Sequence, residues 1–349
     1  MRPIAVVTGA SGGVGRATSA AFARAGCDVA LLARGDAGLD AAAEQVGAVG
    51  GRALAVPTDV SDYDQVFDAA ARIESELGPI EVWVNDAMTT VFAPVNRIDP
   101  ADFRRAVEVT FLGQVWGTIA ALGRMRPRDR GAIVNVGSAL AYIGIPLQSA
   151  YCASKFACRG FFESTRAELL HEGSNIRLSM VHLPAVNTPQ FDWCEDEMSH
   201  TPMPVPPIYQ PELAAQRILE TAMDGRRERV VGSWNKLLVA AASVAPGIGN
   251  HYAAETAWES QLTDEPVPPD RETNLDHPVD ADLDHGAHGG FDARANGVTD
   301  PEFLASLPSV VRALGQATTA TFRERAAARR RAARSRSGEL LGMSEAGPG

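Results

Sequence analysis

The stretch Ile4-Ala-Val-Val-Thr-Gly-Ala-Ser-Gly-Gly-Val-Gly15 decides the fold of this chain. Its first five residues are apolar or β-branched and predict a short buried strand, Ile4–Thr8. The glycines that follow permit positive φ and let the backbone approach a ligand closely. An Ala-rich helix to about Ala25 comes next, and its amino end offers free N–H groups to an anion. A strand, a glycine turn and a helix in this order predict a loop that cradles phosphate.

Strands alternate with helices along the chain beyond this first unit. We expect further strands at residues 28–33, 52–56, 80–84, 132–136, 175–182 and 229–232. This alternation predicts an α/β fold with a Rossmann-type, doubly wound parallel sheet of about seven strands and helices on both faces. We place this domain at residues 1–260. An acidic segment rich in Pro, Gly and His (261–300) is expected to form an irregular linker or wrap, and 301–349 a helical, Arg-rich tail.

Composition and charge exclude several classes of protein. The net charge is -11, which argues against binding nucleic acid. No apolar run reaches the roughly 20 residues of a transmembrane helix, although the Arg-rich tail leaves a contact with a membrane surface open. The four cysteines lack a paired spacing and the first strand leaves no room for a signal peptide, so we expect a cytoplasmic protein. We interpret Asp284, His285 and His288 as solvated loop residues and predict no metal site.

The end of the second expected strand bears on which dinucleotide the glycine loop would hold. An acid at this position takes the ribose 2′-hydroxyl in units that bind NAD. Ala33 stands there instead, and Arg34 follows it. A guanidinium binds a 2′-phosphate in a forked, charge-assisted way, whereas a carboxylate would repel it. We therefore predict NADP(H), with Asp59 and Val60 beside the adenine ring.

A second motif lies at residues 135–155, NVGSALAYIGIPLQSAYCASK. Ser138 follows a buried strand, and Tyr151 and Lys155 lie one turn apart on one face of the next helix. A nearby lysine ammonium favours the phenolate and moves the pKa of the tyrosine from about 10 toward neutral pH. A hydroxyl, a phenol and an ammonium at the edge of a sheet suit proton transfer to a carbonyl oxygen. The Tyr-x-x-x-Lys pair alone is common on ordinary helices, and the glycine loop upstream is what gives it weight.

These two motifs together resemble the short-chain dehydrogenase/reductase family, over roughly residues 3–235. The resemblance implies an oxidoreductase that moves a hydride between NADP(H) and a carbonyl or alcohol. It implies that Tyr151 is the acid-base, that Lys155 holds the ribose and that Ser138 orients the substrate. It also implies a homodimer or homotetramer. The residues expected at the cofactor are Thr8, Gly9, Ser11, Gly13, Val14, Gly15, Arg34, Asp59, Val60, Asn85, Ala87, Tyr151, Lys155, Pro184 and Thr188.

Two segments depart from the family pattern. Residues 85–88 read Asn-Asp-Ala-Met where Asn-Asn-Ala-Gly is usual, so Met88 adds bulk. Thr110 stands where an Asn usually supports a water chain to the lysine. A Thr can hold a water at shorter reach, so we count Thr110 among the catalytic residues. These departures leave open a second hypothesis, that the chain is a cofactor-binding sensor or scaffold with weakened catalysis.

The expected walls of the substrate pocket are apolar or aromatic. We place Met88, Phe92, Leu140, Tyr142, Phe191 and Trp193 there. Such walls suit a neutral, fairly hydrophobic ketone or secondary alcohol. The long Pro-rich loop at residues 184–207 is a candidate lid, although Phe191 and Trp193 would equally serve to pack it against the core.

Overall fold

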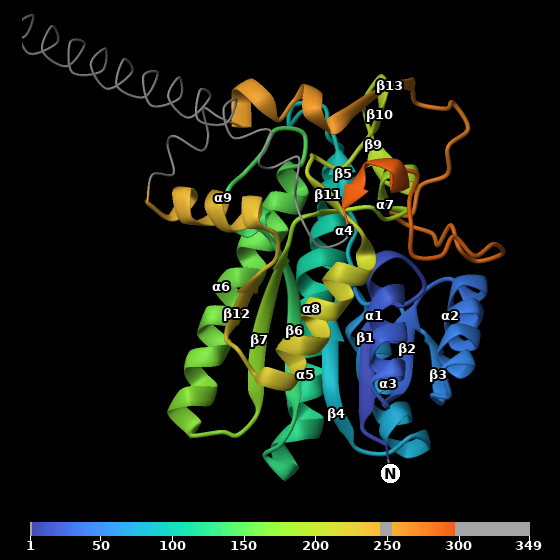
Figure 1. Cartoon of the computed structure of the whole chain (residues 1–349), viewed down its shortest axis with the longest axis vertical. Helices are drawn as coiled ribbons and strands as arrows, with labels where there is room; N and C mark the ends of the chain where they lie inside the picture. Colours follow the sequence, from blue (N-terminus) through green and yellow to red (C-terminus); the bar gives the residue numbers. More distant parts are fainter. Residues whose placement is uncertain (1, 245–252, 297–349) are drawn as a thin grey trace, which may run out of the picture.

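The computed structural model describes residues 2–244 and 253–296 (Figure 1). A seven-stranded parallel sheet has the order β12-β7-β6-β4-β1-β2-β3, which confirms the doubly wound fold. Strand order reverses between β1 and β4, and a ligand crevice forms outside the carboxyl ends at such a point. The strands are β1 Ile4–Thr8, β2 Asp28–Ala33, β3 Ala53–Pro57, β4 Ile80–Asn85, β6 Ala132–Ser138, β7 Arg177–Leu183 and β12 Glu228–Val230.

Helices cover both faces of the sheet. One core cluster joins the sheet to α3, α5 and α6, and a second joins it to α1, α2 and α8. Both faces of each central strand are therefore buried, and these strands are almost entirely apolar for that reason. The helices are α1 Gly13–Arg24, α2 Asp36–Ala48, α3 Tyr63–Glu76, α4 Pro100–Val107, α5 Gly113–Met125, α6 Ser149–Glu172 and α8 Pro211–Asp224.

The helix before β6 is interrupted. The run from 101 to about 125 contains no proline and predicts one continuous helix, but residues Glu108–Leu112 form a π turn between α4 and α5. The Thr110 hydroxyl both donates to Thr89 O (2.7 Å) and accepts from Thr89 N (3.0 Å), which ties this turn to the loop after β4. The run Pro100–Arg128 is long and apolar enough to cross a membrane, but 61% of its apolar window is buried inside the protein. It serves here as a core helix.

Short elements close the carboxyl edge of the sheet. They include α7, within the Pro-rich loop, and α9, which follows β12. They are β5 Val91–Phe92, β8 Ala185–Val186, α7 Gln190–Trp193, β9 Glu195–Asp196, β10 His200–Pro202, β11 Ile208–Tyr209, α9 Ser233–Val244, β13 Leu262–Pro266 and β14 Ala295–Asn296.

A segment that we call the strap, residues 271–289, returns over this edge (orange to red in Figure 1). It has almost no regular structure, yet it is held by hydrogen bonds along its length. Asn274 N donates to Trp193 O (2.9 Å), and Gly38 N and Gly13 N donate to the carbonyls of Asp280 (3.1 Å) and Gly286 (3.2 Å). The strap therefore links the Pro-rich loop to the starts of α1 and α2. The predicted Arg-rich tail, 301–349, lies outside the described residues.

Candidate active site

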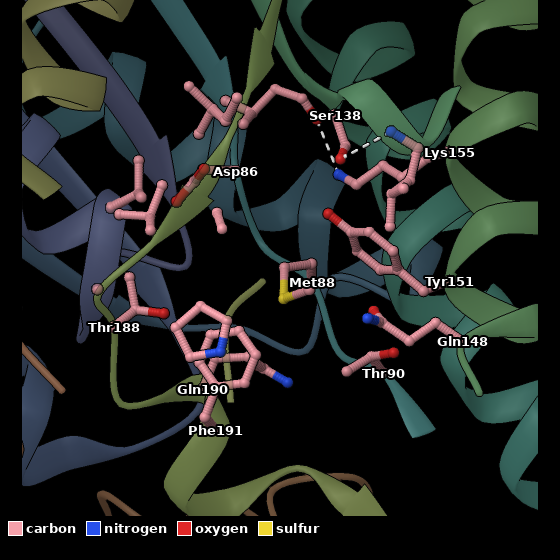
Figure 2. Close-up of a pocket in the computed structure, with 18 of the residues that line it drawn as sticks. Asp86, Met88, Thr90, Ser138, Gln148, Tyr151, Lys155, Thr188, Gln190 and Phe191 are labelled. Atoms are coloured by element: carbon pink, nitrogen blue, oxygen red, sulfur yellow. Dashed lines mark hydrogen bonds between the residues drawn. The ribbon is translucent and has the colours of Figure 1, made fainter. Parts of the chain in front are cut away.

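A cavity of about 560 Å³ opens at the carboxyl ends of the central strands. The glycine loop lines one end of it, and the Pro-rich loop and α9 line the other. Figure 2 shows Ser138, Tyr151 and Lys155 on one side of the space, with Asp86 and Thr188 across from them. The two motifs that the sequence singled out, which lie far apart along the chain, thus meet at one cavity.

The second motif is brought together by β6 and α6. Ser138 is the last residue of β6, and its Oγ accepts a hydrogen bond from Leu140 N (3.1 Å). Lys155 is 3% exposed, and its Nζ donates to Val136 O (2.8 Å) and lies 5.4 Å from the centre of the Tyr151 ring. A buried ammonium held by a strand carbonyl has one fixed position. The three groups are therefore preorganised before any substrate enters.

The pKa of Tyr151 differs from the sequence expectation. Burial raises it above the ordinary value, and the Lys155 ammonium and a hydrogen bond from Ser138 oppose that rise only in part. The expected shift toward neutral pH is corrected accordingly, because removing a phenolate from water costs more than one neighbouring cation restores. In this structure the phenol keeps its proton at neutral pH.

The glycine loop has the close approaches that a dinucleotide site requires. Gly9 has φ +69°, and a Cβ there would lie 2.9 Å from the Ala87 Cα. Gly13 has φ +53°, and a Cβ there would lie 3.2 Å from the Thr188 side chain. Larger residues would fill this cradle or strain its backbone. A phosphate-bearing cofactor therefore fits the residues present.

Most of the predicted site residues line the cavity, and four do not. Asn85, Thr8 and Gly15 lie behind its wall. The Asn85 side chain bonds to Trp83 and Asn135 in the core, and Thr8 Oγ1 accepts from the backbone N–H groups of Asp86 (3.0 Å) and Ala87 (3.1 Å). These residues shape the cofactor wall rather than touch its contents. The predicted residues that line the cavity are Gly9, Ser11, Gly13, Val14, Arg34, Asp59, Val60, Ala87, Ser138, Tyr151, Lys155, Pro184 and Thr188.

Thr110 is the fourth predicted residue that does not line the cavity. Its hydrogen bonds do not fit the expected proton relay. Its side chain is 1% exposed, and its single O–H donates to Thr89 O. A hydroxyl has only one proton to donate, so Thr110 has none left for a relay water. The residue anchors the loop after β4.

Arg34 also differs from its predicted role. Its Nη1 donates to the carbonyls of Leu275 and Asp276 (3.1 Å each), and its Nη2 donates to that of Asn274. Burial lowers the pKa of Arg34, while the nearby carboxylates of Asp59 and Asp280 oppose that change. The guanidinium thus lines the adenosine end of the cavity but binds the strap.

The far end of the cavity is apolar, but one residue predicted to line it, Tyr142, does not do so. Met88, Phe92, Leu140 and Phe191 line it as expected. Trp193 also lines the cavity, but its ring lies against the glycine loop, 3.4 Å from the position of a Gly12 Cβ. Tyr142 instead donates to Glu228 (2.9 Å), which also lies 3.1 Å from His182. His182, which is buried, in turn contacts Ser138 O (3.2 Å), so this half-buried network supports the end of β6. No periodic pattern in the sequence pointed to a further group of lining residues, which comes from α9 and from the residues after 252: Trp234, Asn235, Leu238, Ala253, Thr256, Ala257 and Ser260.

Asp86 is a titratable residue that lines the cavity, and the sequence alone predicted no role for it. Its carboxyl lies against Gly15 at the glycine loop and across the cavity from Lys155. Burial raises its pKa to about 7, against the opposing effects of Lys155 and the Gly15 N–H. The carboxyl is therefore neutral in mild acid and becomes an anion near neutral pH, beside the donors that suit a pyrophosphate.

We expect the affinity for a dinucleotide to fall as the pH rises from 6 to 8.5, because ionised Asp86 repels the pyrophosphate. Asp86→Asn should remove most of this dependence and bind about tenfold more tightly at pH 8.5, the equivalent of one pKa unit. Calorimetric titration at several pH values measures it, with exposed Asp68→Asn as the matched control. An unchanged pH profile of dinucleotide affinity in Asp86→Asn would refute the assignment.

The raised pKa of Asp86 also affects folding. The free energy of unfolding falls as the pH rises through about 4 to 7, since only the folded state retains this proton there.

Comparison with known proteins agrees with this geometry. A family model for short chain dehydrogenases matches residues 3–197. The uncharacterized oxidoreductase YxnA of Bacillus subtilis is 30% identical over 274 residues, 78% of this chain and 77% of that protein. The 3-dehydrosphinganine reductase of Danio rerio is 30% identical over 231 residues, 63% of this chain and 68% of that protein. A short chain dehydrogenase/reductase from Burkholderia phymatum, solved with NAD, has a TM-score of 0.64 at 21% identity, over 68% of this chain and 92% of that one. The chain belongs to the short-chain dehydrogenase/reductase family of oxidoreductases.

Proposed function

We propose that the protein transfers a hydride between a nicotinamide dinucleotide and a fairly hydrophobic ketone or secondary alcohol. One observation carries the proposal: Ser138, Tyr151 and Lys155 face the same cavity as the glycine loop. A dinucleotide bound there would supply the hydride. Gly9, Gly13 and Thr188 would line the space for its phosphate and nicotinamide parts, and the Gly13 N–H would exchange its bond to Gly286 O for one to the phosphate.

The remaining chemistry belongs to the side chains of this chain. The Ser138 hydroxyl, which bonds to the phenol in the unliganded chain, turns to donate its hydrogen bond to the substrate oxygen and holds that oxygen beside the phenol. Tyr151 gives its proton to the oxygen that gains charge on reduction and takes it back on oxidation. The raised pKa of the phenol favours the protonated form, which is the form that reduction needs. Lys155 places a positive charge beside the ring and stabilises the phenolate that remains.

The substrate class follows from the walls of the cavity. Its far end is formed by Phe92, Leu140, Phe191 and Leu238, with Gln148 as a neutral polar group among the cavity-lining residues. Of the described residues there, no Arg or Lys is available to bind a carboxylate substrate. The Danio rerio relative is named a 3-dehydrosphinganine reductase.

The choice between NAD(H) and NADP(H) is a separate question from the reaction class. Arg34 is the basis for predicting NADP(H), and its donors serve strap carbonyls in the folded chain. One structural neighbour was solved with NAD and another, an archaeal alcohol dehydrogenase, with 5-hydroxy-NADP. NADP(H) is the prediction from the sequence alone, and homo-oligomer assembly and a cytoplasmic location likewise stay predictions.

A ketone panel tests the proposal directly. Purified full-length protein with NADH or NADPH should oxidise the reduced cofactor in the presence of long-chain or cyclic ketones, followed by the loss of its near-ultraviolet absorbance. Each additional buried methylene contributes about 0.8 kcal/mol, so kcat/KM should rise several-fold per methylene. Matched 2-oxo acids are the control and should react poorly. A preference for the charged substrates would contradict the assigned class.

A second candidate has specific support from Thr110 and Asp86. The Thr110 proton is not available to a proton relay, and the Asp86 carboxyl titrates near pH 7. Both features would suit a protein that binds the dinucleotide and turns over its substrate slowly. Such a sensor would bind NADH or NADPH tightly in calorimetry while failing every member of the ketone panel. Turnover of any panel member at an ordinary enzyme rate excludes it.

A further inference from the structure

One acid lines the adenosine end of the cavity without a donor of its own. Asp280, in the strap, is 8% exposed and lines the cavity. Among residues 2–244 and 253–296, none donates a hydrogen bond to its carboxylate. A buried carboxylate without a donor is costly, and native proteins normally supply it with a partner. The carboxylate lines the cavity, so a molecule bound there can supply the missing donors.

The position of Asp280 is where the second ribose of a dinucleotide belongs. Its carboxylate lies over Gly35 and Gly38, at the start of α2, and a Cβ on either glycine would overlap it. Ser11 of the glycine loop lies beside the same point, with its Cβ 2.8 Å from the position of a Gly38 Cβ. β2 ends at Ala33, directly before Arg34, so this is the site that an acid at the end of β2 would otherwise serve.

The cations around this site already have partners. Arg34 binds three strap carbonyls. Arg105 pairs with Asp59 (2.6 Å), and Arg16 pairs with Asp284 of the strap (3.0 Å). Within the described part of the chain, a 2′-phosphate would therefore meet an unpartnered carboxylate and three arginines that are already engaged.

We infer that Asp280 accepts hydrogen bonds from the hydroxyls of the adenosine ribose, and that the strap thereby makes the site select NAD(H) over NADP(H). The acid that β2 lacks is supplied from the C-terminal side of the chain. Ribose hydroxyls provide the donors that Asp280 needs, whereas a 2′-phosphate brings only negative charge and acceptors. This inference rests on the proposed function and departs from the prediction of NADP(H) that was based on Arg34.

A purely structural role is the competing explanation for Asp280. A carboxylate near the amino end of α2 interacts favourably with the helix dipole. In that case the acid would stabilise the strap and leave the choice of cofactor untouched. The two explanations differ in a measurable ratio, the relative affinity for NADH and NADPH.

The test is calorimetric titration of the full chain with NADH and with NADPH. Wild-type protein should bind NADH at least about tenfold more tightly than NADPH, since the loss of a hydrogen bond to a charged group weakens binding by about tenfold or more. Asp280→Asn keeps the shape and removes the charge, and should reduce that ratio by about tenfold or more. Asp282→Asn, at an exposed position of the same strap, should keep the wild-type ratio.

Arg34→Ala separates the two roles of the arginine. If it anchors the strap, both dinucleotides should weaken by a similar factor; a loss confined to NADPH would show that it recognises the 2′-phosphate and would overturn the inference. A wild-type preference for NADPH would also overturn it, as would an Asp280→Asn variant with a lower Tm and an unchanged ratio. Equal tight binding of both dinucleotides would refute the selection while leaving the oxidoreductase intact. Binding of neither would refute the proposed function itself.

Discussion

Tyr151→Phe is expected to lower kcat by about 10³-fold, within the range that a positioned general acid contributes. The phenyl ring keeps the packing of α6 but has no proton to give to the substrate oxygen. The Kd of the dinucleotide should change by less than about twofold, because Lys155 keeps its bond to Val136 O. Stopped-flow turnover with calorimetry measures the two quantities separately.

Tyr63→Phe provides the matched control for this experiment. Tyr63 lies on α3, is 45% exposed and stacks on Phe67 at the surface, far from the cavity-lining residues. It loses the same hydroxyl and should keep the wild-type kcat. Near-normal turnover in Tyr151→Phe would remove the phenol from the mechanism, and an equal loss in both variants would indicate a general effect on the fold.

Gly15→Ala is expected to disrupt the glycine loop and lower stability by about 3 kcal/mol, as overpacked cores do. A Cβ at Gly15 would lie 2.7 Å from the Gly9 carbonyl carbon and closer still to its oxygen, and both are backbone atoms that cannot rotate away. Alanine gains roughly 1 kcal/mol of helix propensity, which is too little to offset this overlap. Because the loop must move by about 1 Å, dinucleotide affinity should fall on the order of 100-fold.

Gly47→Ala in α2 separates the overlap from helix propensity. The position is exposed, and a Cβ there would meet nothing within 4 Å, so stability should rise by roughly 0.5–1 kcal/mol. Urea denaturation of both variants gives the two free energies of unfolding. The explanation fails if Gly15→Ala is as stable as Gly47→Ala and binds the dinucleotide normally.

The strand and helix order could be predicted because each element carries its own pattern. β1, β2 and β4 are short apolar runs, and both faces of such strands are buried in a parallel sheet. Tyr151 and Lys155 could be paired because one helical turn separates them, whatever the rest of the fold does. The π turn at Glu108–Leu112 was missed since the Thr89 backbone that bonds Thr110 lies on another element.

The roles of single polar side chains could not be predicted from local patterns in the same way. Asn85 was expected at the cofactor from its place after β4, yet its amide points into the core, where Trp83 and Asn135 offer partners. Tyr142 was expected in the pocket wall and is held by Glu228. A polar group goes where its hydrogen bonds can be satisfied, and those partners are set by strands that only packing brings together.

The sequence by itself determined the doubly wound fold, the glycine loop and the alignment of Ser138, Tyr151 and Lys155, since these depend on local periodicity and spacing. The tertiary structure alone decided that burial outweighs Lys155 at the Tyr151 phenol and that Arg34 binds the strap. It also placed Asp280 beside the starts of α1 and α2. Desolvation and long-range contact depend on which distant segments share a volume, and no local pattern in the chain carries that information.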